Sequence, residues 1–167
     1  MFEPGGFADE RGLLRLNRVE RLLVTTMRRL VAGVGLCAGV SREFQALCGS
    51  QTDEVLLGVR GFLYVLDRSA RRMLIVAPPS WLGPTADEWR LLGLISAAQA
   101  REEVRLAAVA CWFACRDLQP LVAQASYILA DRLVERNLWI STTFSESARS
   151  TSSASLPGRG AAVSPAR

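Results

Sequence analysis

The sequence predicts a mainly α fold, a compact bundle of five to six helices with one short strand or β-hairpin element. Half of the 167 residues are apolar, which is enough to build a core. The apolar residues recur at three- and four-residue steps through most of the chain, as one face of a helix requires. Composition then divides the chain into a flexible N-terminus (1–15), a single helical domain (16–144) and a tail (145–167) rich in Ser, Ala, Arg, Gly and Pro, expected to be disordered.

Signals at helix ends set the expected bounds. Asn17 with Glu20, and Thr85 with Glu88, have capping-box spacing, in which each side chain accepts an N–H from the other residue. Gly49 is typical of a helix C-terminus. The helices expected from these signals and the apolar spacing span 18–32, 42–48, 53–67, 85–99, 101–114 and 117–136, with Ser41 and Asp117 as further N-caps and Pro120 in a first turn. Gly58 and Gly61 inside the third helix could admit a close neighbour.

One segment does not fit the helical pattern. Residues 73–77 are five consecutive apolar residues followed by Pro78 and Pro79, which predicts a short buried strand. A lone strand leaves its backbone unpaired, so it needs a partner. The partner could be the alternating segment 138–144 or a second copy of the chain, or the segment could simply be extended.

Missing residue types restrict the chemistry. The chain has no His, and all 20 basic residues are Arg because it also has no Lys. This excludes Ser-His-Asp triads, imidazole metal ligands, Schiff-base lysines and the lysine-dependent phosphate loop. We therefore expect no catalytic residues and no cofactor.

The four cysteines, Cys37, Cys48, Cys111 and Cys115, do not form CxxC pairs. We expect buried, reduced thiols that act as small apolar residues, with Cys111 and Cys115 on one helix face. A four-thiolate zinc site would require Cys37 and Cys48 to converge on that face. No metal site is therefore predicted.

Charge and hydropathy favour a cytoplasmic, soluble protein. No apolar run approaches the length of a transmembrane segment, and Glu3, Asp9 and Glu10 precede the first Arg, opposite to a signal peptide. Of the formal net charge of +4, about half comes from the tail, so the folded part is only weakly basic.

Two groups of arginines are candidate binding residues for an anion or a partner. Four lie on the first helix and three precede the expected strand: Arg18, Arg21, Arg28, Arg29, Arg68, Arg71 and Arg72. Such a basic helix could contact nucleic acid, an anionic membrane or an acidic protein, and guanidinium groups bind phosphates and carboxylates bidentately. The ordinary alternative is a solvated helix face and a polar loop in an arginine-rich chain.

The loop after the expected strand is the candidate pocket. It comprises Pro78, Pro79, Ser80, Trp81 and the N-cap Thr85. Loops that lead into a helix N-terminus often carry ligand sites, and Trp81 offers a flat apolar face. The alternative is a stiff linker whose Trp fills the edge of the core.

Several short motifs resemble a family of small alphaproteobacterial proteins of unknown function. They are Arg28-Arg29-Leu30 leading to Gly35, the Phe44 helix ending at Gly49, Val76-Ala77-Pro78, Thr85-x-Asp87-Glu88 before a leucine run, and Ile128-Leu129-Ala130-Asp131. The family pattern has a Cys and an Arg-Met pair between the Ala-Pro and the Thr, where this chain has Pro79 to Pro84. This departure counts against a metal or thiol role for the loop. The family has no assigned activity, so the resemblance implies none.

The leading functional hypothesis is a small, non-catalytic regulatory or adaptor protein that acts through contacts with another protein or with itself as a homodimer. The alternatives are nucleic-acid or anionic-membrane binding through the arginines, and a small-molecule or enzymatic site at 78–85.

Overall fold

A computed structural model describes residues 16–141 of the protein. It confirms the mainly α prediction. The α-helices are α1 (Arg18–Val31), α2 (Ala38–Cys48), α3 (Thr52–Ser69), α4 (Ala86–Gln99), α5 (Glu103–Phe113) and α6 (Gln119–Val134), with 3-10 turns η2 (Gly49–Gln51) and η3 (Arg116–Leu118). The predicted flexible N-terminus (1–15) and tail (145–167) lie outside the described residues.

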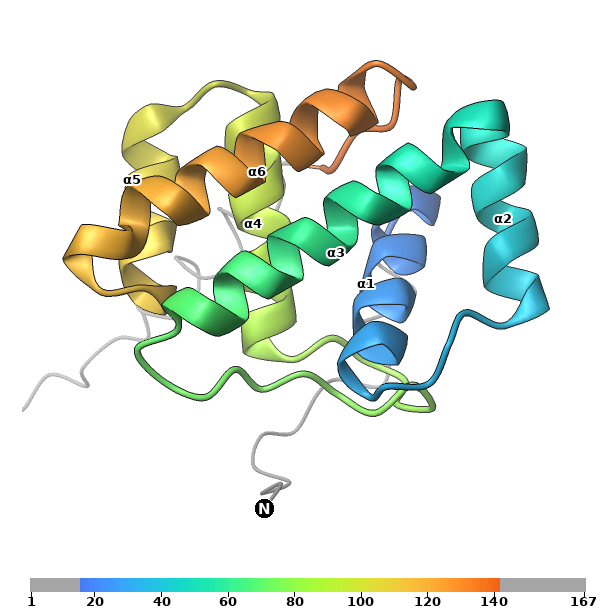
Figure 1. The fold of residues 1–167 in the computed structure, drawn as a ribbon, viewed down its shortest axis with the longest axis horizontal. Helices are drawn as coiled ribbons and strands as arrows, with labels where there is room; N and C mark the ends of the chain where they lie inside the picture. Colours follow the sequence, from blue (N-terminus) through green and yellow to red (C-terminus); the bar gives the residue numbers. More distant parts are fainter. Residues whose placement is uncertain (1–15, 142–167) are drawn as a thin grey trace, which may run out of the picture.

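The helices form two layers (Figure 1). In front, α3 and α6 lie side by side and run antiparallel, while α1 and α4 lie behind them. The α2 helix flanks α1 at one edge of the molecule, and α5 returns antiparallel to α4 at the other. One core cluster extends through the elements and includes Phe44, Phe62, Ile95, Phe113 and Leu129.

A glycine permits the close approach of α3 to α6. A Cβ built on Gly58 would lie 3.4 Å from Cδ1 of Leu129 and 3.9 Å from its Cα. The predicted role of Gly58 is therefore confirmed. Gly61 is different, because a Cβ there would meet nothing within 4 Å.

The two capping boxes are confirmed, whereas two other predicted caps are wrong. The side chains of Asn17 and Thr85 each accept the N–H of the Glu three residues later, and each Glu accepts in return. However, α2 starts three residues before Ser41, and Asp117 lies inside η3. Val40, which precedes Ser41, is buried against the core as part of the first turn of α2. The helix therefore begins before Ser41, in spite of the capping preference of that residue.

The predicted strand at 73–77 is not formed. Among the described residues the β pairing is an isolated antiparallel bridge between Ala70 and Ala114. Residues 73–77 are instead extended loop, the third of the alternatives above. Met73 and Ile75 are exposed, so the segment is not buried on both sides as its composition predicted.

The segment after α6 is also not a strand in its described part. The side chain of Gln99 replaces a strand partner: its Nε2 donates to the carbonyl of Leu138, and its Oε1 accepts the N–H of Ile140. Glu20 accepts the N–H of Ser141 at 2.7 Å. Side chains from α1 and α4 thus hold this segment against the bundle.

The cysteine prediction is wrong for three of the four thiols. Cys48 is buried, but Cys37, Cys111 and Cys115 are exposed. The α5 helix ends at Phe113, so Cys115 lies beyond the helix face that carries Cys111. No group of three or more His, Cys, Asp or Glu within residues 16–141 could hold a metal ion.

Candidate functional site

A buried ion pair joins α1 to α4. The Nε of Arg28 donates to Oε1 of Glu88 at 2.7 Å, and its Nη2 donates to Oε2 at 2.8 Å. The side chains are only 2% and 0% exposed. A guanidinium and a carboxylate meet here in the planar, two-bond geometry that Arg favours.

The same two side chains fix the backbone of the loop between α3 and α4. Arg28 also donates to the carbonyls of Trp81 and Gly83. Glu88 also accepts the N–H groups of Ala77 and Thr85, at 3.1 and 2.7 Å. The second half of the loop, 77–85, is therefore tied to one buried ion pair instead of to a neighbouring strand.

Asp87 anchors the first half of the loop. It accepts two hydrogen bonds from the Arg72 guanidinium, one from Arg90 and one from the N–H of Ile75. The hydroxyl of Thr85 donates to the carbonyl of Ile75 at 2.6 Å. The first turn of α4 thus binds backbone groups along most of the loop.

The environment of Asp87 favours its ionised form. Burial opposes ionisation, but the hydrogen bonds from Arg72 and the Ile75 N–H, with the charges of Arg72 and Arg90, outweigh it and lower the pKa of Asp87. The guanidinium groups of Arg72 and Arg90 also lie over the Trp112 ring, 5.4 and 4.1 Å from its centroid. These contacts tie the loop and α4 to α5.

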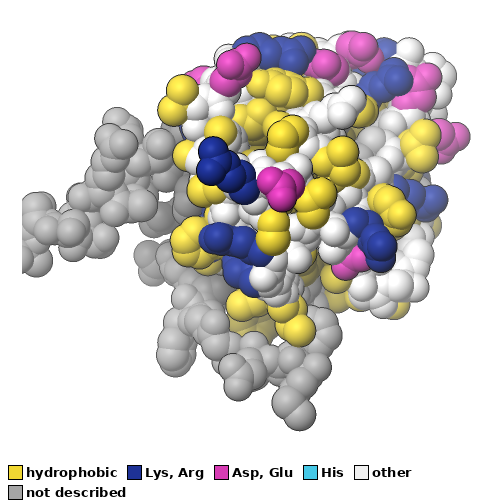
Figure 2. Space-filling model, turned by 60° about the vertical axis from the view of Figure 1, so that its left-hand side comes forward, with side chains coloured by type: hydrophobic (Ala, Val, Ile, Leu, Met, Phe, Trp, Pro, Cys, Tyr) yellow, Lys and Arg dark blue, Asp and Glu magenta, His cyan; other side chains and the backbone are white. Residues whose placement is uncertain are grey.

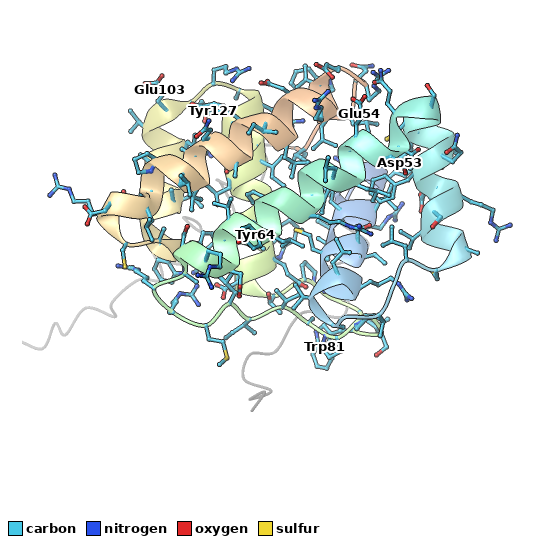
Figure 3. All side chains as sticks on the ribbon, viewed as in Figure 1. Asp53, Glu54, Tyr64, Trp81, Glu103 and Tyr127 are labelled. Atoms are coloured by element: carbon cyan, nitrogen blue, oxygen red, sulfur yellow. The ribbon has the colours of Figure 1, made fainter. Side chains whose placement is uncertain are left out.

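The clamped loop presents large apolar side chains to solvent. The exposed fraction is 75% for Met73, 48% for Ile75, 46% for Trp81 and 63% for Leu82. Figure 3 shows Trp81 at the lower edge of the molecule, directed away from the helices.

The loop between α1 and α2 extends this surface. It passes beside the α3–α4 loop along the same edge (Figure 1), where Arg28 joins α1 to Trp81 and Gly83. We call the exposed apolar residues of the two loops, together with the last residue of α1, the ledge. They are Val31, Val34, Met73, Ile75, Trp81 and Leu82.

The segments that form the ledge, 29–42 and 68–86, carry arginines and no acidic residue, although Asp67 and Asp87 directly flank the second of them. The charge of Arg72 is matched by Asp87, but Arg29 and Arg71 donate only to carbonyl groups in the described structure. A ledge without carboxylates repels cations and suits an apolar partner that carries negative charge.

The predicted arginines do not form one surface. Arg28 is buried against Glu88, which leaves its side chain inaccessible to a partner. Arg72 is 31% exposed and is bound to Asp87 within the chain. Arg18 pairs with Glu43 on α2. Arg21 lies in the first turn of α1, whereas Arg29 lies in its last turn, next to the ledge.

The second predicted group of arginines lies where α3 ends. Arg68 is in the last turn of α3, and Arg71 follows it with its Nε bound to the carbonyl of Trp112. Both side chains are exposed. Of the seven predicted arginines, Arg29, Arg68 and Arg71 therefore lie in the segments of the ledge without a carboxylate bound to them in the described structure.

The predicted pocket loop divides into two parts. Pro78, Pro79, Ser80 and Trp81 are exposed, so Trp81 does not fill the core edge as the linker alternative required. Thr85 caps α4 and binds the loop, so it is an internal structural residue.

The sequence did not reveal that Arg28 and Glu88 form a buried ion pair that fixes the α3–α4 loop. Glu88 was expected only as a capping residue and Arg28 as a surface cation. A signal for Arg28 was present, because it follows Val24 by four residues and therefore lies on the apolar face of its helix. Nothing local to Glu88 indicates that its partner is 60 residues away.

No helix in the described part of the chain has the length and apolar character needed to cross a bilayer. Comparison of the chain with protein-family models, curated proteins and solved structures finds no match. The resemblance to the alphaproteobacterial family therefore stays a prediction.

Proposed function

We propose that this protein is a non-catalytic adaptor whose ledge binds an acidic, amphipathic segment of another protein. One observation carries the proposal: a loop with no regular secondary structure is clamped by the buried Arg28–Glu88 pair while its largest apolar side chains face solvent. A clamped loop loses little conformational entropy on binding, which favours affinity.

The chemistry of the ledge supports this class of partner. Exposed Trp, Met and Leu side chains are typical anchors of protein interfaces. Arg29 and Arg71 at the border attract carboxylates, and no neighbouring acid in the two loops competes for them. Nucleic acid is less favoured, because the predicted arginines are dispersed and several are occupied within the chain.

The test begins with a photoreactive amino acid at position 82 in cells that produce the protein. Leu82 is 63% exposed, and its side chain takes no part in the clamp. We expect a cross-link to an acidic segment of one protein. The matched site is Leu57, which is 70% exposed on α3, away from the ledge, and should give no such adduct.

A synthetic peptide of the cross-linked segment then allows titration by fluorescence anisotropy. Leu82→Ser should weaken binding about tenfold or more, because burying a Leu side chain is worth about 1.5–3 kcal/mol. Leu57→Ser should leave the Kd unchanged. Arg71→Glu should weaken binding and reduce its salt dependence, whereas Arg60→Glu on α3 should not.

Two results would overturn the proposal. Equal cross-linking at positions 57 and 82 would show that the ledge is not a specific surface. The second result has three parts: the protein sediments with vesicles of phosphatidylglycerol and phosphatidylcholine, Leu82→Ser abolishes this, and no protein adduct forms. The partner of the ledge would then be an anionic membrane and not an acidic protein.

A further inference from the structure

The α5 helix is apolar around most of its circumference but buried on one side only. Leu106, Ala110 and Phe113 face the core. On the opposite face Val104 is 87% exposed, and Ala107, Ala108 and Cys111 are also exposed. In Figure 1, α5 lies at the edge of the molecule, behind the first turns of α6. A helix that is apolar on all sides is normally buried, so this outer face is suited to a partner.

Charged groups of opposite sign flank the two ends of this face. Glu102 and Glu103 begin the helix, and Figure 3 shows Glu103 at its outer upper end. Glu102 is paired with Arg105, whereas Glu103 forms no ion pair with a described residue. The N-terminal end of the face therefore has an unmatched carboxylate.

The C-terminal end is basic. Arg72 and Arg90 lie over Trp112, and Arg71 binds the Trp112 carbonyl. Arg116 follows the helix, is exposed and makes no ion pair within residues 16–141. With Asp87 and Asp117 counted, four arginines face two carboxylates here. Figure 2, which turns this side of the molecule forward, shows hydrophobic side chains exposed among the charged ones.

The outer face is shallowly indented near its N-terminal end. An open depression is lined by Arg101, Glu102, Glu103, Val104, Arg105 and Ala108. It lies on the same side as the exposed apolar residues and next to the unmatched Glu103. Two Arg and two Glu line it. Because Arg101 pairs with Asp131 and Arg105 with Glu102, Glu103 is the carboxylate that a positive charge of a partner would face.

We propose that a second copy of this chain covers this face, with the two α5 helices packed antiparallel. Antiparallel packing sets the acidic end of each helix beside the basic end of the other, so one surface is complementary to itself, as a two-fold interface requires. Glu103 begins α5 and Arg116 lies three residues beyond its last residue, so the helical part of this span, 103–113, is about 15 Å long. The two-fold axis then passes between Ala108 and Cys111, whose small side chains let the helices approach closely.

This contact shares Arg71 with the border of the ledge. The variants that test it, at Glu103, Ala108 and Arg116, all lie outside the ledge. The first experiment measures the dimer dissociation constant of the purified full chain by analytical ultracentrifugation. Ala108→Arg places a charge at the centre of the face and should abolish the dimer, whereas Arg60→Glu on α3 should leave it intact. Circular dichroism establishes that each variant keeps its helices.

A charge swap tests the antiparallel arrangement. Glu103→Arg and Arg116→Glu should each raise the dimer dissociation constant about tenfold, because each removes both symmetric Glu103–Arg116 pairs between the two copies. The double variant should restore the affinity, because each new Arg again faces a new Glu. If the loss of dimerisation free energy in the double variant equals the sum of the losses in the two single variants, the antiparallel arrangement is wrong.

Cysteine cross-linking locates the axis. In a chain with Cys37→Ser and Cys115→Ser, Cys111 is the exposed thiol left among the described residues, and a short bis-maleimide should join two chains through it. A chain that keeps Cys37 instead, with Cys111→Ser and Cys115→Ser, should not cross-link. A monomer at 100 µM, or a dimer that Ala108→Arg does not affect, would refute the proposal.

Discussion

Arg28 and Glu88 are buried almost completely, although an ion pair gains little from burial alone. Removing both charges from water costs several kcal/mol, and only good geometry with further hydrogen bonds offsets that cost. Here the pair also satisfies two carbonyls and two N–H groups of the α3–α4 loop. We therefore interpret the pair as a device that fixes the conformation of one loop.

The ion pair leads to a prediction about stability. Replacing one partner, by Arg28→Met or Glu88→Leu, should lower the free energy of unfolding by about 3–5 kcal/mol, because it leaves a buried charge unpaired. The double variant should lose at least about 2 kcal/mol less than the sum of the single losses. Urea unfolding measures all four proteins. Additive losses would mean that the two charges act separately.

Asp87 leads to a prediction about pH. Because folding lowers its pKa, its stabilising contribution is complete above the unfolded value of about 3.9 and is lost as pH falls through the lower folded value. Asp87→Asn should be less stable than the wild type at pH 7, and the difference should shrink below about pH 4. Thermal unfolding between pH 2.5 and 7 measures it, with Asp67→Asn as the control for loss of one carboxylate. A difference independent of pH would contradict the assignment.

At the scale of elements, local signals were sufficient for most helices but not for the loop. The capping boxes at Asn17 and Thr85 and the terminal Gly49 bind or shape their own backbone neighbours, so a short stretch of sequence contains the information. The extended segment 73–77 could not be predicted in the same way. Its hydrogen-bond partners are side chains of Asp87 and Glu88, which follow it, held in place by Arg28 from another helix.

Two glycines should respond oppositely to the same substitution. Gly61→Ala should raise the free energy of unfolding by about 0.5–1 kcal/mol, because a Cβ there meets nothing and Ala favours a helix. Gly49→Ala should lower it by about 1 kcal/mol, because Gly49 has a φ of 57° at the end of α2. Urea unfolding of both variants is the measurement. Destabilisation by Gly61→Ala would mean that an unseen contact covers this position.

At the scale of the molecule, a predicted arginine can bind a partner only if its side chain is exposed in the folded chain. Spacing alone placed the seven candidate arginines on two surfaces, yet packing buried one and paired others within the chain. The ledge was not foreseen, because Met73 and Ile75 have the composition of a buried strand. Its exposure follows from the paths of two loops that meet only in the folded chain.

Amide hydrogen exchange of the free protein tests most directly whether the Arg28–Glu88 pair fixes the α3–α4 loop. The amides of Ala77 and Thr85 should be protected like those of helices, because both donate to the buried Glu88, whereas the exposed Ser80 should exchange rapidly. Glu88→Gln should accelerate Ala77 and Thr85 more than the core of α3. Exchange of Ala77 and Thr85 as fast as that of Ser80 would show that the buried Arg28–Glu88 pair does not fix the loop.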